Sequence, residues 1–134
     1  MHDLNWLAII AAAVSAFLLG GIWYGPLFKN AWCREAGVDP NAKPKSHPAK
    51  TFAIAFVASL VAAYGFAMLL HLTNSGTELW KAVHAGVMVG FFYVAMSFGI
   101  NYAFAGRSLK LWLIDAGYHI LQFALYGVIL GLWH

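Results

Sequence analysis

The chain has 134 residues, of which 62% are hydrophobic and only 10% are charged, and its formal net charge at pH 7 is +3. Soluble domains average about 25% charged residues, so this composition excludes an ordinary water-soluble fold. A chain with so few polar groups cannot cover its apolar surface in water, and we therefore expect lipid to be its solvent. The single cysteine excludes an internal disulfide.

Four long stretches, at 4–28, 51–77, 82–106 and 111–134, lack Lys, Arg and Glu and together contain one Asp. Each is long enough for a helix to cross the roughly 30 Å of bilayer hydrocarbon. Transmembrane strands need only about 10 residues and alternate in polarity, which these stretches do not. The sequence therefore predicts an all-α integral membrane four-helix bundle, a single domain over residues 1–134, with helices at about 4–24, 51–72, 78–104 and 109–133.

The connections between these helices differ in length. Gly25 and Pro26 are expected to end the first helix, and the connection 25–50 that follows is too short to bury a core of its own. Its first part, LFKNAW, is expected to lie along the membrane surface. The turns at 74–76 and at Gly106 are short, which predicts antiparallel hairpins for the helices that they join.

Lys and Arg are distributed unevenly among the connections. Only Lys81 lies in the second connection, and the two ends of the chain have none. Cytoplasmic connections carry an excess of Lys and Arg, so the sequence predicts a cytoplasmic long loop, with the N- and C-termini on the outer side. Because topology accounts for the positive charge, no nucleic-acid partner is expected. The first and third connections hold the other seven basic residues: Lys29, Arg34, Lys43, Lys45, Lys50, Arg107 and Lys110.

Small residues recur every four positions in all four predicted helices, a spacing that aligns them on one face and lets helix backbones approach closely. Such faces serve either packing within the bundle or association between copies of the chain. Four short helices have more such faces than internal packing needs, which favours a homo-oligomer. The sets are Ala8, Ala12, Ala16 and Gly20; Ala55, Ser59, Ala63 and Ala67; Gly86 and Gly90; and Gly127 and Gly131.

The last helix contains an unusual polar stretch, LIDAGYHILQ (113–122). At 100° per residue, Asp115, His119 and Gln122 share one face, and Tyr118 flanks them. An ionisable group at the bilayer centre costs about 3 kcal/mol on insertion scales, so this face should meet protein or water. Asn101 of the third helix lies at a similar depth and is expected to bridge to Asp115. The stretch predicts either a polar intramembrane site that handles protons or a ligand, or hydrogen bonds that only fasten helices.

Histidines near the outer ends of the second and third helices raise the question of a metal or haem. His71 and His84 are the two candidates, but no short ligand motif accompanies them, and Cys33 is expected on the opposite side. We therefore predict no metal site and no cofactor. No nucleophile motif or phosphate-binding loop occurs either, so the sequence does not favour an enzyme, and no catalytic residue is expected.

The stretch GGIWYGPLFKNAW near the N-terminus, with the later pieces N-x-x-F and R-x-L-x-x-x-x-I-D-x-G-Y, resembles a bacterial membrane family known as domain of unknown function 1761. The resemblance covers nearly the whole chain. It implies a four-span protein of the bacterial inner membrane and implies no activity. The matching positions are Gly21, Trp23, Tyr24, Gly25, Pro26, Phe28 and Trp32, followed by Asn101, Phe104, Arg107, Leu109, Ile114, Asp115, Gly117 and Tyr118.

Two functions fit these features. The first is a homo-oligomeric binding or transport bundle, in which the polar stripe of the last helix lines a path or pocket. The second is a non-catalytic accessory subunit that docks onto a larger membrane complex through its small-residue faces. In either case the lipid bilayer is the first partner of the chain.

Overall fold

The computed structural model describes residues 4–39, 41 and 47–134, and every regular element in this part of the chain is helical. Four helical spans within it are long and apolar enough to cross a membrane, at Trp6–Leu27, Pro48–Leu72, Leu79–Ala105 and Leu109–Leu132. The predicted all-α four-helix architecture is confirmed. Lys43 and Lys45 of the predicted basic loop lie outside the described residues.

The first span is longer than predicted. Helix α1 (Trp6–Ile22) begins at Asn5, whose side chain accepts a hydrogen bond from the Ala8 amide, and it continues into a π-helical turn, η1 (Trp23–Leu27). The expectation that Gly25 and Pro26 end the helix is wrong. Proline lacks an N–H, but the wider turn tolerates this, and the Phe28 amide bonds to the Trp23 carbonyl five residues earlier.

The long connection contains a short helix, α2 (Lys29–Ala36), which ends at Gly37 in the left-handed conformation with a φ of 73°. Helix α3 (Pro48–Leu72) follows, with proline in its first turn and the His47 ring accepting the Ala49 amide. Proline is favoured at this position because the first helical amides have no intrahelical partner. Helix α2 therefore occupies the segment that was expected to lie at the membrane surface.

The third span consists of three pieces: α4 (Leu79–Met88), a π-helical segment η2 (Val89–Ala95) and α5 (Met96–Ala105). The Trp112 indole donates a 2.8 Å hydrogen bond to the carbonyl of Ala95, the last residue of η2. Gly106 then reverses the chain with a φ of 70°. Helix α6 (Leu109–Leu132) begins at Ser108, whose side chain accepts the Leu111 amide.

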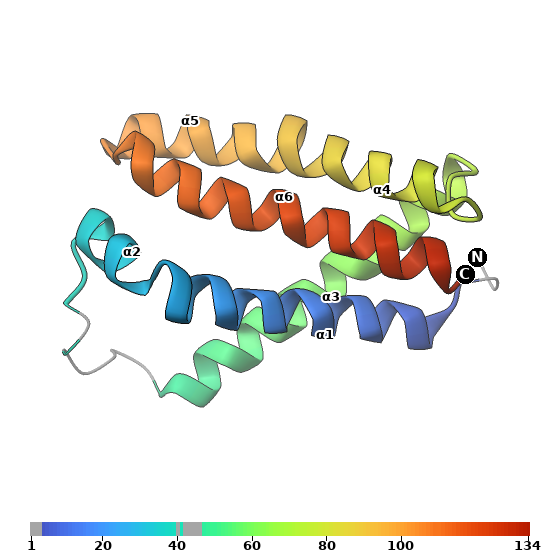
Figure 1. The fold of residues 1–134 in the computed structure, drawn as a ribbon, viewed down its shortest axis with the longest axis horizontal. Helices are drawn as coiled ribbons and strands as arrows, with labels where there is room; N and C mark the ends of the chain where they lie inside the picture. The colour runs from blue at the N-terminus through green and yellow to red at the C-terminus, as the bar shows by residue number, and fades with distance from the viewer. Residues whose placement is uncertain (1–3, 40, 42–46) are drawn as a thin grey trace.

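Helix α6 lies between α1 and the third span, and α3 crosses α1 diagonally (Figure 1). The predicted hairpin of the third span with α6 is present, whereas α3 packs mainly along α1 and contacts the third span only near their shared turn. The start of α1 and the end of α6 lie at the same end of the molecule (Figure 1). There the Asn5 side chain donates a 3.3 Å hydrogen bond to the Trp133 carbonyl.

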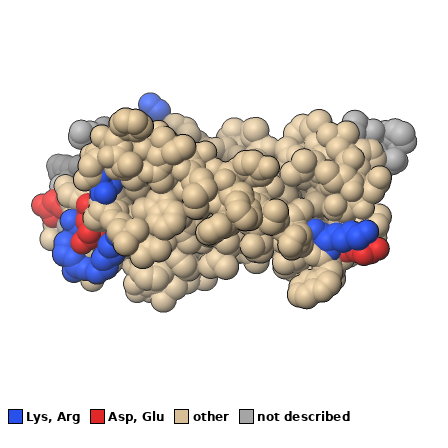
Figure 2. All heavy atoms as spheres, turned by 90° about the horizontal axis from the view of Figure 1, so that it is seen from above, with Lys and Arg blue, Asp and Glu red and all other residues tan. Residues whose placement is uncertain are grey.

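Charged side chains gather at the two ends of the molecule, and the face between them is uncharged (Figure 2). Large apolar side chains are exposed along all four spans, among them Leu18, Val57, Phe92 and Leu121. An uncharged middle with exposed apolar side chains is unstable in water and suits a bilayer. The chain is therefore a multi-pass membrane protein.

The small-residue faces pack inside the bundle. Ala8, Ala12 and Ala16 of α1 are fully buried. A Cβ atom at Gly86 would lie 2.1 Å from the Phe123 carbonyl oxygen, and one at Gly127 would lie 2.4 Å from the Ala82 carbonyl oxygen. Helices α4 and α6 therefore touch backbone to backbone at these glycines, so the glycine stripes are not free to bind a second copy of the chain.

Replacing Gly86 with Ala should force α4 away from α6, because the added methyl group meets rigid backbone rather than a movable side chain. We expect a loss of roughly 1–3 kcal/mol in the free energy of unfolding, the usual range for overpacking. Thermal or SDS unfolding in micelles measures this. The matched control is Gly65→Ala, because a Cβ at Gly65 meets nothing within 4 Å; equal stability of both variants would contradict the close contact.

Candidate functional site

Asp115 is the acidic residue of the membrane spans, and only 7% of its surface is exposed. It lies six residues after Leu109, the first residue of α6, which places it roughly 9 Å from the start of that helix at 1.5 Å per residue. A carboxyl group at this depth cannot rely on water and must be satisfied by protein. The prediction that this residue faces protein rather than lipid is confirmed.

Three side chains from three other segments donate to Asp115. The Tyr24 hydroxyl is 2.5 Å from Oδ1, and the Trp32 indole nitrogen is 3.1 Å from the same oxygen. The Tyr102 hydroxyl donates to Oδ2. Tyr24 belongs to η1, Trp32 to α2 and Tyr102 to α5. One carboxyl group therefore connects four segments through neutral donors, and no ion pair found among the described residues includes it.

The local structure at the end of the first span brings these donors to α6. The Trp23 indole donates a 2.9 Å hydrogen bond to the Ile114 carbonyl, and its ring lies against Gly117, where an added Cβ would be 3.1 Å from it. The next residue, Tyr24, packs edge to face on Trp32 with ring centroids 6.1 Å apart. The π-helical turn and α2 therefore place two neighbouring aromatic rings on the carboxyl group.

A second hydrogen-bond chain begins at His119 and crosses the bundle. Its Nδ1 lies 2.6 Å from the Gln122 side-chain oxygen, and the Gln122 amide donates at 2.7 Å to the Tyr126 hydroxyl. That hydroxyl is 2.7 Å from the Ser59 hydroxyl of α3. Tyr126 is fully buried and Gln122 is 6% exposed. His119, Gln122 and Tyr126 of α6 therefore form a connected hydrogen-bond chain that reaches Ser59 of α3 through the core.

The structure assigns the predicted site residues to different partners. The hydrogen bond of His119 goes to Gln122 rather than to Asp115, and its ring stacks on Phe98 with centroids 4.9 Å apart. Tyr118 donates to the Ala16 carbonyl at 2.9 Å. The expected bridge from Asn101 to Asp115 is wrong, since Asn101 is exposed and its neighbour Tyr102 makes the contact instead.

Sequence reasoning did not identify Trp32 and Ser59 as site residues. Trp32 follows a helix end and resembles an interfacial anchor, whereas Ser59 belongs to a run of small residues in α3. No local signal links either residue to α6. Their partners lie 83 and 67 residues later in the sequence, so only the folded chain reveals these contacts.

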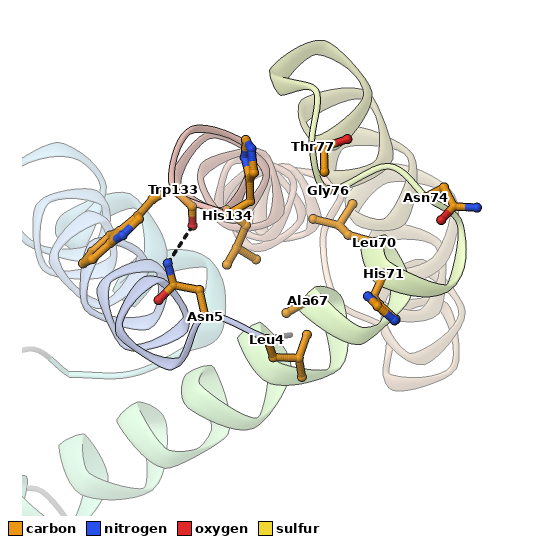
Figure 3. Close-up of a pocket in the computed structure, with 11 residues that line it drawn as sticks. Leu4, Asn5, Ala67, Leu70, His71, Asn74, Gly76, Thr77, Trp133 and His134 are labelled. Atoms are coloured by element: carbon orange, nitrogen blue, oxygen red, sulfur yellow. Dashed lines mark hydrogen bonds between the residues drawn. The ribbon is translucent and has the colours of Figure 1, made fainter. Parts of the chain in front are cut away.

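The two candidate metal ligands lie apart from this site. His71 lines a cleft of about 360 Å³ at the end of the molecule where the termini meet, together with Leu4, Leu70 and His134 (Figure 3). His84 of α4 is not among the residues that line the cleft. Within the described part of the chain, no group of three or more His, Cys, Asp or Glu side chains is arranged to hold a metal.

Contacts beside Gly106 attach α2 to the start of α6. The Ser108 hydroxyl donates a 2.6 Å hydrogen bond to the Glu35 carboxylate, and the Arg107 guanidinium donates at 2.9 Å to the Ala36 carbonyl. The Ser108 hydrogen bond is the main reason that the pKa of Glu35 lies below its ordinary value, with Lys110 and Arg34 adding smaller effects of the same sign. The loop helix is therefore held beside the Asp115 site.

Replacing Tyr102 with Phe should destabilise the protein by roughly 1–3 kcal/mol, because it removes one donor from a buried carboxyl group. The measurement is the free energy of unfolding in micelles. Tyr64→Phe is the matched control, since the Tyr64 ring stacks on Trp6 and its hydroxyl makes no hydrogen bond within the described residues. If both variants lose the same free energy of unfolding, the Tyr102 hydrogen bond does not contribute to the stability of the fold.

Replacing Ser108 with Ala should raise the pKa of Glu35 toward its ordinary value, because the dominant stabilising contact of the carboxylate is removed. A group whose pKa is lowered by folding stabilises the fold above its ordinary pKa, and this contribution is lost as the pH falls through the lowered value. NMR titration of the Glu35 carboxyl carbon measures the shift. Arg34→Gln should raise the pKa less, and the opposite order would contradict the assignment.

Comparison with known proteins identifies a family and no individual relative. The profile of the family described as Protein of unknown function (DUF1761) matches residues 7–131. Comparison with the curated proteins and with the solved structures gives no match. Several of the positions that carry the resemblance seen in the sequence, namely Trp23, Tyr24, Trp32, Gly117 and Asp115 itself, meet around the buried carboxyl group. The chain belongs to the DUF1761 family.

Proposed function

We propose that this protein is a small proton-transport bundle of the bacterial inner membrane, in which Asp115 takes up and releases the proton. The basic residues, seven in the first and third connections against one in the second, support an orientation with the long loop in the cytoplasm and both termini outside. Asp115 then lies near the cytoplasmic end of its span and receives protons from that side.

The observation that carries this proposal is that Asp115 is buried and forms no ion pair with any residue that the structure describes. A buried carboxylate that serves only to hold helices together is commonly neutralised by Lys or Arg. Here the donors are two phenols and an indole, none of which carries a permanent positive charge. Such a carboxyl group can bind a proton or a small cation and release it again.

The second hydrogen-bond chain supports a path through the bundle. His119, Gln122 and Tyr126 follow Asp115 on α6, and Tyr126 lies eleven residues beyond it, roughly 16 Å at 1.5 Å per residue. Imidazole and hydroxyl groups exchange protons, and polar chains of this kind mark proton relays in membrane proteins. In this proposal Tyr24, Trp32 and Tyr102 orient Asp115, and Gln122 orients His119.

The proposal includes no covalent chemistry and no cofactor. The described site contains carboxyl, imidazole, amide and hydroxyl groups bonded to one another, and no activated nucleophile accompanies them. We also propose that the protein works as a homo-oligomer. The surface for this association must differ from the glycine faces, which α4 and α6 already occupy.

Asp115→Asn should abolish proton flux in proteoliposomes, because an amide cannot take up a proton at neutral pH. The flux is driven by a potassium gradient with valinomycin and is followed with a pH-sensitive dye inside the vesicles. His119→Ala should lower the flux, because it removes the imidazole that begins the hydrogen-bond chain through Gln122 and Tyr126. The matched control is Asp39→Asn, which removes the same group from an exposed loop position and should leave the flux unchanged.

Folding of each variant is checked by helical circular dichroism and by gel filtration in detergent. A folded Asp115→Asn variant with the flux of the parent protein rejects the transport proposal. Absence of flux in the parent, combined with stoichiometric recovery of another membrane protein in mild detergent, favours the accessory-subunit function instead.

A further inference from the structure

Three polar side chains lie on the exposed face of the third span. Tyr93, Ser97 and Asn101 follow one another at intervals of four residues, so they share one side of the helix. Tyr93 is 69% exposed, and Ser97 and Asn101 are also classed as exposed. None of them makes a hydrogen bond within the described residues. We call Tyr93, Ser97 and Asn101 the outer polar stripe.

The depth of the outer polar stripe makes its exposure unfavourable in a bilayer. The span ends at Ala105, so at 1.5 Å per residue Asn101 lies roughly 6 Å, Ser97 roughly 12 Å and Tyr93 roughly 18 Å from that end. Asn101 is close enough to the interface to reach water. The short side chain of Ser97 and the phenol of Tyr93 are not, and hydrocarbon offers them no partner.

The third span is also the least covered of the four. Of its most apolar 18 residues, 17% are buried, against 39% for α6 and 28% for each of the other spans. Its contacts are almost entirely with α6, so the side that faces away from α6 has no neighbour among the residues that the structure describes. The outer polar stripe runs along this free side, and Phe92, Met96 and Ile100 are exposed beside it.

We propose that the outer polar stripe is the interface with a second copy of this chain, related by a two-fold axis along the membrane normal. Such an axis brings identical residues together. A hydroxyl or an amide both donates and accepts a hydrogen bond, so Tyr93, Ser97 and Asn101 can each pair with themselves. A group that only donates or only accepts could not do so.

This interface deepens the proposed self-association and does not depend on the proton path. Hydrogen bonds between polar side chains are a main source of helix association in lipid, where no hydrophobic effect separates helices from solvent. Two copies in one orientation have the same basic loop on the same side, as the charge distribution requires. The dimer removes Ser97 and Tyr93 from hydrocarbon without moving any contact of the Asp115 site.

Cross-linking through Ser97 tests the interface directly. Cys33 is the single cysteine of the chain, so a Cys33→Ala background leaves one thiol per copy when Ser97→Cys is added. Mild oxidation in membranes should give a covalent dimer at about twice the chain mass of 14.7 kDa. Val57→Cys is the matched control, because Val57 is exposed on α3 at a similar depth, roughly 14 Å from Pro48, and it should stay monomeric.

A second measurement covers the case in which cysteine variants fold poorly. Energy transfer between labelled copies is followed while vesicles are diluted with lipid, which yields a dissociation constant in the bilayer. Combining Tyr93→Phe, Ser97→Ala and Asn101→Leu should weaken association, by about threefold to tenfold for each polar group removed. The matched control, Val57→Ala with Val61→Ala, alters exposed apolar residues of α3 and should leave association unchanged.

Three results overturn this inference. One is a dimer that persists in the triple variant and does not cross-link at Ser97, which means that copies associate through another face. Another is a monomer at all dilutions of the parent protein. The third is a Ser97 cross-link to a different protein. Proton flux is measured in a separate experiment, so a result that rejects the transport proposal does not affect this test of the dimer interface.

Discussion

A carboxyl group inside a membrane span must be bonded to protein, because hydrocarbon supplies no hydrogen-bond donor. In this chain Tyr24, Trp32 and Tyr102 meet that requirement for Asp115, and they come from three separate segments. Satisfying one acidic group therefore fixes the end of the first span, the helix of the long loop and the C-terminal end of the third span against α6. The hydrogen bond between Ser108 and Glu35 extends the same attachment to the loop.

Helix α6 packs against all the other spans, because different sides of it carry different kinds of side chain. Toward α4 it presents glycines, which allow backbone contact where lipid provides no hydrophobic force. Toward α1 and α3 it presents polar groups, with Tyr118 bonded to the Ala16 carbonyl and Tyr126 bonded to Ser59. Close approach on one side and hydrogen bonding on the other make α6 the most buried span.

Sequence alone predicted the spans and the centre of the site, because hydropathy and an isolated acidic residue are local properties. The rotation of each helix about its axis is not local. Depth alone places Asn101 against Asp115, but the helix presents Tyr102 there and turns Asn101 outward. Pro26 signals a helix end, yet a wider turn absorbs its missing N–H. Trp32 reaches the carboxyl group only because α2 folds back to it.

The π-helical segment Val89–Ala95 divides the third span into two half-helices of different phase. Helix α4 packs on α6 at Gly86, the π-helical segment packs on α6 at Gly90, and α5 contacts α6 through the Tyr102 hydroxyl. One residue inserted into or deleted from this segment would turn α5 by about 100° relative to α4. Tyr102 would then turn away from Asp115 and lose its hydrogen bond to the carboxyl group, although the length and hydropathy of the span would scarcely change.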